Sequence, residues 1–159
     1  MAGGRISIRG AEPSDAEELI ALLRVLFTIE EDFSYNETVQ RRGMALLISK
    51  QGPERQVFVA EKGGRVAGMC SIQTLISTAE GGLVGQVEDV IVSEGYRGNG
   101  IGNALMDAVD GWAREKRLKR LQLLAERDNT QALKFYQSRG WQITNLICVR
   151  KFPLSEDIP

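Results

Sequence analysis

The chain has 159 residues, 43% of them hydrophobic, and a formal net charge of −1, which indicates one soluble globular domain spanning residues 1–159. The near-zero charge argues against nucleic acid as the main partner, because nucleic-acid binders carry a strong basic excess. No stretch approaches the roughly 20 apolar residues of a membrane span, and the start does not resemble a signal peptide. We therefore expect a cytoplasmic protein without a membrane partner.

The sequence contains no histidine. This excludes Ser-His-Asp and Cys-His catalysis and histidine-based metal sites, and we expect no metal. The two cysteines, Cys70 and Cys148, lie in apolar stretches without an evident cationic partner, where a cysteine usually behaves as a small buried hydrophobe. Any general base must therefore be a carboxylate, a tyrosine, a lysine or water.

The first half of the chain predicts a strand, two helices and a three-stranded meander. Ile6 and Ile8 alternate with polar neighbours, as in a short strand, and leucines then recur at helical spacing after Pro13. Gly63 and Gly64 mark a hairpin turn between β-branched runs. The expected elements after the first strand are helices over 13–28 and 38–49 and strands over 56–60, 66–77 and 83–92.

The second half predicts a helix over 100–116, a strand over 118–125, a helix over 129–138 and a final strand over 141–152. The resulting order is typical of an α/β (α+β) fold with a mixed, mostly antiparallel sheet and helices on both faces. Because a helix connects the strands 83–92 and 118–125, we expect these two to lie side by side and parallel.

Residues 87–102, VEDVIVSEGYRGNGIG, lead from a strand through a glycine-rich turn into a helix. Glycines let a ligand approach the backbone, and the free N–H groups and dipole of a helix N-terminus favour a phosphate. The dinucleotide fingerprint is excluded because Asn103 replaces its third glycine, and no P-loop motif is present. A plain glycine-rich turn remains the alternative.

Two motifs together resemble the GNAT superfamily of N-acetyltransferases. The run from Arg97 to Gly102 is similar to the superfamily's [Q/R]-x-x-G-x-[G/A] motif. The second motif resembles its N…A…FY…GF signature and consists of Asn129, Ala132, Phe135, Tyr136, Gly140 and Trp141. The order of the expected elements matches that fold over nearly the whole chain.

The resemblance implies that the chain binds acetyl-CoA as a cosubstrate and transfers its acetyl group to an amine. The loop would hold the pyrophosphate, and the end of the preceding strand would pair with the pantetheine arm as an added strand does. A backbone N–H in the same stretch would stabilise the oxyanion. The residues implied in this binding are Val90, Ile91, Val92, Arg97, Gly98, Asn99, Gly100, Ile101, Gly102, Asn103, Asn129, Ala132 and Tyr136. For Arg97 the alternative is a solvated loop arginine, and for Asn129 it is a helix cap.

The resemblance also implies that Tyr136 is the general acid that protonates the departing thiolate, the alternative being a core-facing aromatic residue. For the base we select Glu88, because strand alternation groups it with Val90 and Val92 and separates it from Asp89. The Glu88-Asp89 pair resembles that of glucosamine-6-phosphate acetyltransferases; an edge charge or a structural ion pair is the alternative. Ribosomal-protein alanine acetyltransferases carry a glutamate base on the strand after the connecting helix, where this sequence has Leu124. This difference argues against ribosomal N-termini as the acceptor.

The connection between the first two helices combines carboxylates with aromatic rings. In the superfamily this connection borders the acceptor site, and such a combination suits a small cationic amine; a solvated acidic loop is the alternative. The residues selected for substrate binding are Phe27, Glu30, Glu31 and Phe33. A competing hypothesis is a non-catalytic acyl-CoA-binding sensor of the same fold. A homodimer is compatible with the sequence.

Overall fold

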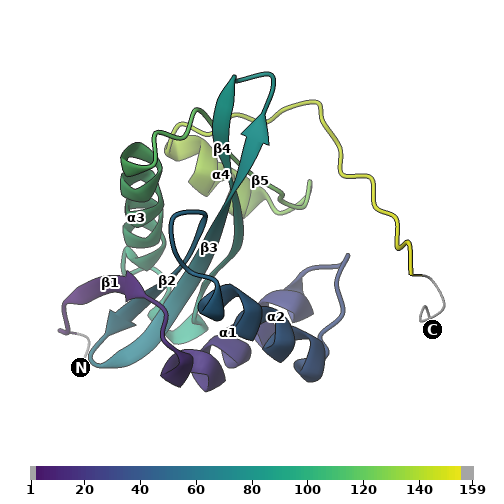
Figure 1. Cartoon of the computed structure of the whole chain (residues 1–159). Helices are drawn as coiled ribbons and strands as arrows, with labels where there is room; N and C mark the ends of the chain where they lie inside the picture. Colours follow the sequence, from purple (N-terminus) through teal and green to yellow (C-terminus); the bar gives the residue numbers. More distant parts are fainter. Residues whose placement is uncertain (1–2, 155–159) are drawn as a thin grey trace. The chain divides into compact units, whose positions relative to one another are not determined.

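The computed structural model describes residues 3–154 (Figure 1). The chain divides into two compact units, Met1–Leu123 and Leu124–Pro159. The first contains the whole sheet and three of the α-helices, and the second contains one α-helix. No helix among the described residues has both the length and the apolar character needed to cross a membrane.

The sheet of the first unit has five strands in the order β1-β2-β3-β4-β5. The first four are antiparallel neighbours, whereas β4 and β5 are parallel, so the predicted parallel pair is confirmed. Strand β5 is shorter than the predicted 118–125 and pairs with β4 only from Gly85 to Val87. The strands are β1 Ile6–Gly10, β2 Arg55–Lys62, β3 Arg65–Ser77, β4 Gly82–Val92 and β5 Leu121–Leu123.

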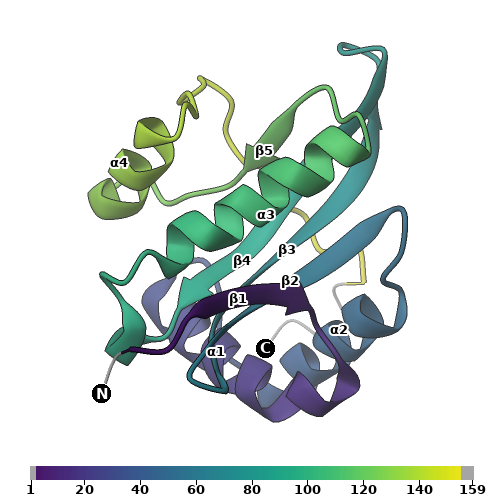
Figure 2. The same cartoon turned by 90° about the vertical axis from the view of Figure 1, so that its left-hand side faces the viewer.

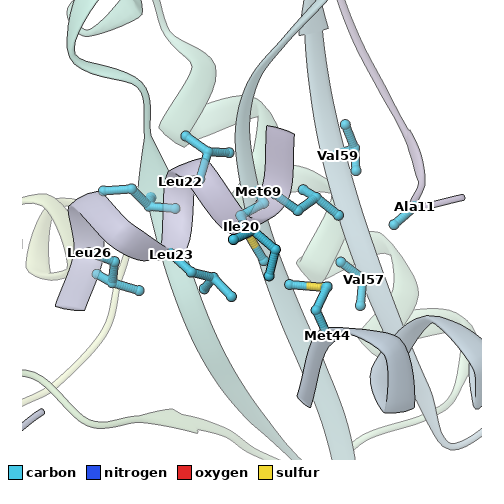
Figure 3. Close-up of a cluster of buried hydrophobic side chains, with 11 residues drawn as sticks. Ala11, Ile20, Leu22, Leu23, Leu26, Met44, Val57, Val59 and Met69 are labelled. Carbon is cyan, nitrogen blue, oxygen red and sulfur yellow. The ribbon is translucent and has the colours of Figure 1, made fainter. Parts of the chain in front are cut away.

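The helices of the first unit cover both faces of this sheet (Figure 2). After the short 3-10 turn η1 (Pro13–Asp15), α1 (Ala16–Ile29) and α2 (Glu37–Ser49) cover one face, and α3 (Ile101–Glu115) covers the other. The leucine spacing predicts the buried side of α1 correctly. Figure 3 shows its leucines beside Val57, Val59 and Met69 of the sheet, in the main buried cluster.

On the other face, α3 packs closely because β3 has a glycine beneath it. A Cβ atom built on Gly68 would lie 2.9 Å from the carbonyl oxygen of Ile91, 3.1 Å from Cγ2 of Ile101 and 3.3 Å from Cδ1 of Leu105. A contact under 3.0 Å with a backbone atom cannot be relieved by a rotamer change. Gly68 therefore sets the approach of the first turns of α3 to the sheet.

A partly buried network of ion pairs joins β1, the start of α1 and β2. Arg9 donates two 2.8 Å hydrogen bonds to the carboxylate of Asp15 and two, of 2.6 and 2.9 Å, to Glu61. Asp15 is 5% exposed and also accepts the backbone N–H of Glu12 at 2.7 Å. The Arg9 bonds hold the pKa of Asp15 below its usual range, so the buried carboxylate stays ionised and paired.

The second unit contains α4 (Thr130–Ser138), as predicted, with Asn129 as its N-cap. The predicted strand over 141–152 is wrong, because the structure assigns no strand to residues 141–154. A strand needs a neighbour for its backbone groups, and an alternating apolar pattern does not supply one. The apolar side chains of this segment are instead exposed: Ile143, Leu146, Ile147, Val149, Phe152 and Leu154.

The two cysteines have different surroundings. Cys70 is completely buried in β3, as expected, whereas Cys148 is exposed. The expectation for Cys148 depended on the strand that the structure lacks.

The close packing at Gly68 gives a stability prediction. Gly68→Ala should lower the free energy of unfolding by about 1–3 kcal/mol, because the new methyl group would lie too close to the backbone carbonyl oxygen of Ile91. Gly111→Ala in α3 is the matched control: a Cβ there meets no atom within 4 Å, so it should raise stability by about 0.5–1 kcal/mol. Urea unfolding measures both. A Gly68→Ala protein as stable as wild type would contradict this packing.

Candidate active site

Strand β4 carries one extra residue near its carboxyl end. Ser71 and Met69 of β3 are two residues apart, but they lie opposite Glu88 and Ile91 of β4, which are three apart. Within this bulge, Asp89 has a φ of +53°, a left-handed conformation that aspartate tolerates better than most side chains. A bulge bends its strand and redirects the side chains that follow.

This bulge changes the faces predicted for the end of β4. Directly opposed residues of an antiparallel pair share a face, so Glu88 and Ile91 lie on the α1 side with Ser71 and Met69. Val92, one residue beyond Ile91, lies on the α3 side. The predicted grouping of Glu88 with Val92 on one face is therefore wrong, because simple alternation fails across an extra residue.

The bulge also gives one carboxyl group an unusual pKa. Glu88 is exposed, whereas Asp89 is half-buried. Burial raises the pKa of Asp89 to about 7, and the nearby charges of Glu88 and Glu30 contribute to the same shift. Strand alternation favours Glu88 and does not indicate Asp89, because no local pattern in the sequence marks the bulge. The only available signal was the adjacent pair of carboxylates.

Cys70, across from the bulge, does not supply a nucleophile. Burial, with a smaller contribution from the charge of Asp89, raises the pKa of its thiol to about 12. A thiol in this state carries almost no thiolate at neutral pH. The titratable group of the bulge near neutral pH is therefore Asp89.

After β4, the 3-10 turn η2 (Glu94–Tyr96) leads into residues 97–103, which we call the glycine loop. Gly98 and Gly100 have φ values of +77° and +80°, and Gly100 is the N-cap of α3. The N–H of Ala104 donates to the Gly100 carbonyl at 3.0 Å. The N–H groups of Ile101 and Gly102 precede that first helical bond, as is usual at a helix N-terminus.

Side chains within the loop fix its shape. Arg97 Nε donates to the Val92 carbonyl at 3.2 Å, and Asn99 Nδ2 donates to the carbonyls of Tyr96 at 3.0 Å and Arg97 at 3.2 Å. Arg97 is exposed and therefore brings a positive charge to the helix N-terminus. The donors of this loop include backbone N–H groups and one guanidinium, which are groups that fit a diphosphate.

The residues selected for substrate binding lie at the end of α1 and in the connection that follows it. The rings of Phe27 and Phe33 lie with centroids 5.4 Å apart, and Glu30 lies close enough to Asp89 to raise its pKa. Glu31 belongs to the same connection and is exposed. Carboxylates and aromatic faces are therefore present near the bulge, on the side where α1 ends.

The remaining selected residues belong to the second unit. Asn129 Oδ1 accepts the Ala132 N–H at 3.1 Å, which confirms the helix-cap alternative for Asn129. Tyr136 is half-buried, and its ring centroid lies 5.2 Å from that of Phe135 and 5.7 Å from that of Trp141. These aromatic contacts fix the position of the Tyr136 ring within its unit.

Comparisons with known proteins agree on one family. The model of the Acetyltransferase (GNAT) family matches residues 18–141, which is well over half of the chain. An uncharacterised N-acetyltransferase of Archaeoglobus fulgidus is 28% identical over 136 residues, covering 84% of this chain and 91% of that protein. The glucosamine 6-phosphate N-acetyltransferase of Trypanosoma brucei brucei is 30% identical over 105 residues, covering 65% of this chain and 69% of that protein.

The fold has counterparts among solved structures. A possible acetyltransferase from Clostridium difficile superimposes with a TM-score of 0.80 at 19% identity, covering 92% of this chain and 97% of that one. At this identity the match concerns the fold alone, and it agrees with the parallel β4–β5 pair and the surrounding helices. Together with the family match over residues 18–141, this means that the chain belongs to the GNAT family and is an N-acetyltransferase.

Proposed function

We propose that the chain transfers the acetyl group of acetyl-CoA directly to the primary amine of a small cationic molecule. One observation carries the proposal: a half-buried carboxyl group with a pKa of about 7 lies in β4, and the chain continues from β4 through η2 into the glycine loop at the N-terminus of α3. This arrangement combines a base suited to neutral pH with a site for a phosphate-bearing donor.

The glycine loop and the end of β4, both in the first unit, supply groups suited to the two parts of an elongated donor. The glycine loop supplies donors for the pyrophosphate, with Arg97 as the accompanying cation. Strand β5 ends opposite Val87, so it leaves the β4 backbone over 88–92 unpaired by β5. The amides of pantetheine can use this edge as an added strand would, and a backbone N–H of 90–92 can stabilise the oxyanion.

The reaction requires a base that deprotonates the acceptor ammonium and an acid that protonates the leaving thiolate. A free alkylammonium has a pKa near 10, so a base must take a proton before the nitrogen attacks the thioester carbonyl. The C–N bond then forms, the C–S bond breaks, and Tyr136 gives its proton to the departing thiolate. The nitrogen loses its second proton to solvent as the amide forms, and a proton taken from solvent restores the Tyr136 hydroxyl. The Tyr136 role is supported by the match of its surroundings to the family signature.

Two carboxylates are candidates for the base. Glu88, which the sequence selects, is exposed and suited to attracting an ammonium ion. Asp89 is half-buried, and its pKa of about 7 is closer to that of an efficient base at neutral pH. We propose that Asp89 removes the proton, directly or through water, while Glu88 attracts the cation and raises the pKa of its neighbour.

The acceptor class follows from the contacts at the end of α1. The Phe27–Phe33 ring pair and the carboxylates of Glu30 and Glu31 favour a cation by charge and by contact with aromatic faces. The trypanosomal relative is named a glucosamine 6-phosphate N-acetyltransferase, which makes amino sugars the first acceptors to test.

The function is tested by acetyl-CoA-dependent thiol release with amino sugars, polyamines, amino acids, aminoglycosides and peptides. We expect turnover with a small amine and, when both substrates are varied, the intersecting initial-rate lines of direct transfer; parallel lines would indicate a covalent acetyl-enzyme instead. CoA binding by calorimetry without thiol release across the panel would support the sensor and contradict the proposal.

A pH profile separates the two carboxylates. Since the base works in its ionised form, wild-type kcat/KM should fall as the pH drops through about 7. Asp89→Asn should lower kcat/KM by about 10²–10⁴-fold and abolish this fall, the acidic limb of the profile. Glu88→Gln removes a repelling charge, so the limb should move to lower pH. If Glu88→Gln abolishes the limb and Asp89→Asn leaves it, Glu88 is the base.

The proton donor is tested by Tyr136→Phe, which keeps the ring and its contacts with Phe135 and Trp141. It should lower kcat by about 10²-fold or more, because the thiolate must then leave unprotonated. Tyr35→Phe controls for the loss of a hydroxyl from a ring that lies under Arg24. Unchanged kcat in Tyr136→Phe across the pH range would rule out the acid role.

A further inference from the structure

A cavity of about 240 Å³ lies where the β2–β3 hairpin meets the glycine loop and the turn before it. The hairpin contributes Lys62 and Arg65, and the other side contributes Tyr96 and Asn99. All these residues belong to the first unit. Because Asn99 lies in both the cavity wall and the glycine loop, the cavity directly adjoins the proposed pyrophosphate site.

The lining of this cavity is one-sided in charge. It includes one lysine and one arginine but no carboxylate, although the chain as a whole has 21 acidic and 20 basic side chains. A concave surface lined by a single sign of charge attracts ions of the opposite sign. The cavity is therefore suited to an anion.

Lys62 is held toward the loop. Its Nζ donates to Asn99 Oδ1 at 3.0 Å, and Asn99 is itself fixed by its bonds to the carbonyls of Tyr96 and Arg97. An ammonium group has three N–H donors, and Asn99 uses one. Lysine binds phosphate as a point charge, whereas arginine offers a bidentate fork, so Lys62 and Arg65 provide complementary donors.

The turn beside these cations leaves the cavity open. Gly63 and Gly64 have φ values of +59° and +74°, the left-handed conformation of a two-residue hairpin turn. A Cβ built on Gly63, Gly64 or Gly95 would meet no atom within 4 Å. No side chain of these three residues therefore obstructs a ligand.

We propose that this cavity binds a phosphate monoester and that its occupant is the 3′-phosphate of CoA. The inference rests on the proposed use of acetyl-CoA by the glycine loop. A phosphate monoester carries a charge of about −1.5 to −2 at pH 7, and the glycine loop has only Arg97 as a cation for the pyrophosphate. The second phosphate of the same ligand needs other cations, and the adjoining cavity supplies two.

The test compares calorimetric affinities for CoA and 3′-dephospho-CoA, with inorganic phosphate as a third ligand. Wild type should bind CoA about tenfold more tightly than 3′-dephospho-CoA, as expected for a charge-assisted contact. Lys62→Met should remove most of that difference by weakening CoA binding alone. Lys50→Met is the matched control, because Lys50 lies at the end of α2, beyond the opposite end of β2 from Lys62. This variant should preserve the difference in affinity between the two CoA forms. Arg65→Met provides a second variant from the hairpin, and the Tm of each variant verifies folding.

Equal wild-type affinity for CoA and 3′-dephospho-CoA would overturn the subsite while leaving acetyl-CoA use intact. A Lys62→Met variant that loses affinity equally for both ligands would also overturn it, because that change does not depend on the 3′-phosphate. Inorganic phosphate binding that requires Lys62 without discrimination between the two CoA forms would assign the cavity to free phosphate. No binding of either CoA form to wild type would reject the proposed donor as well.

Discussion

The arrangement of the candidate site depends on a bulge in β4. Three residue steps of β4, from Glu88 to Ile91, lie opposite only two steps of β3, from Ser71 to Met69. The extra residue sends Glu88 and Ile91 to the α1 face and Val92 to the α3 face. It also holds Asp89 half-buried beside two other carboxylates. A carboxyl group in a regular, exposed position would ionise near pH 4 and be a poor base for an ammonium ion at neutral pH.

The bulge is held in place by its neighbours on both faces. On one face, Ile91 belongs to the buried cluster beneath α1. On the other face, the Ile91 carbonyl lies close to Gly68, against which Ile101 and Leu105 of α3 also pack. The same few residues therefore connect the bend of β4 to the first turn of α3. The relation between the bulge and the glycine loop is consequently set by packing, which is how a site holds reacting groups in register.

The sequence predicts most of the framework because its signals are local. Leucine spacing gives the buried side of α1, a connecting helix gives the parallel β4–β5 pair, and the glycines give the loop. The bulge at Asp89 does not follow from the sequence. Side-chain alternation assumes that each residue of a strand faces one residue of its neighbour, and an extra residue breaks that assumption. The strand expected over 141–152 fails for a related reason: strand formation depends on a partner elsewhere in the chain. Both errors concern pairing, which one segment cannot specify alone.

Acetyl-CoA use, as proposed above, requires the end of β4 and the glycine loop to hold this ligand together. The most direct measurement is a titration of the isotopically labelled chain with acetyl-CoA, followed by backbone amide NMR. We expect the largest shifts at Val90 to Val92 and at Gly98 to Asn103, with the amides of α2 unchanged. Saturable binding whose shifts lie outside both segments, or an absence of shifts at millimolar acetyl-CoA, would contradict it.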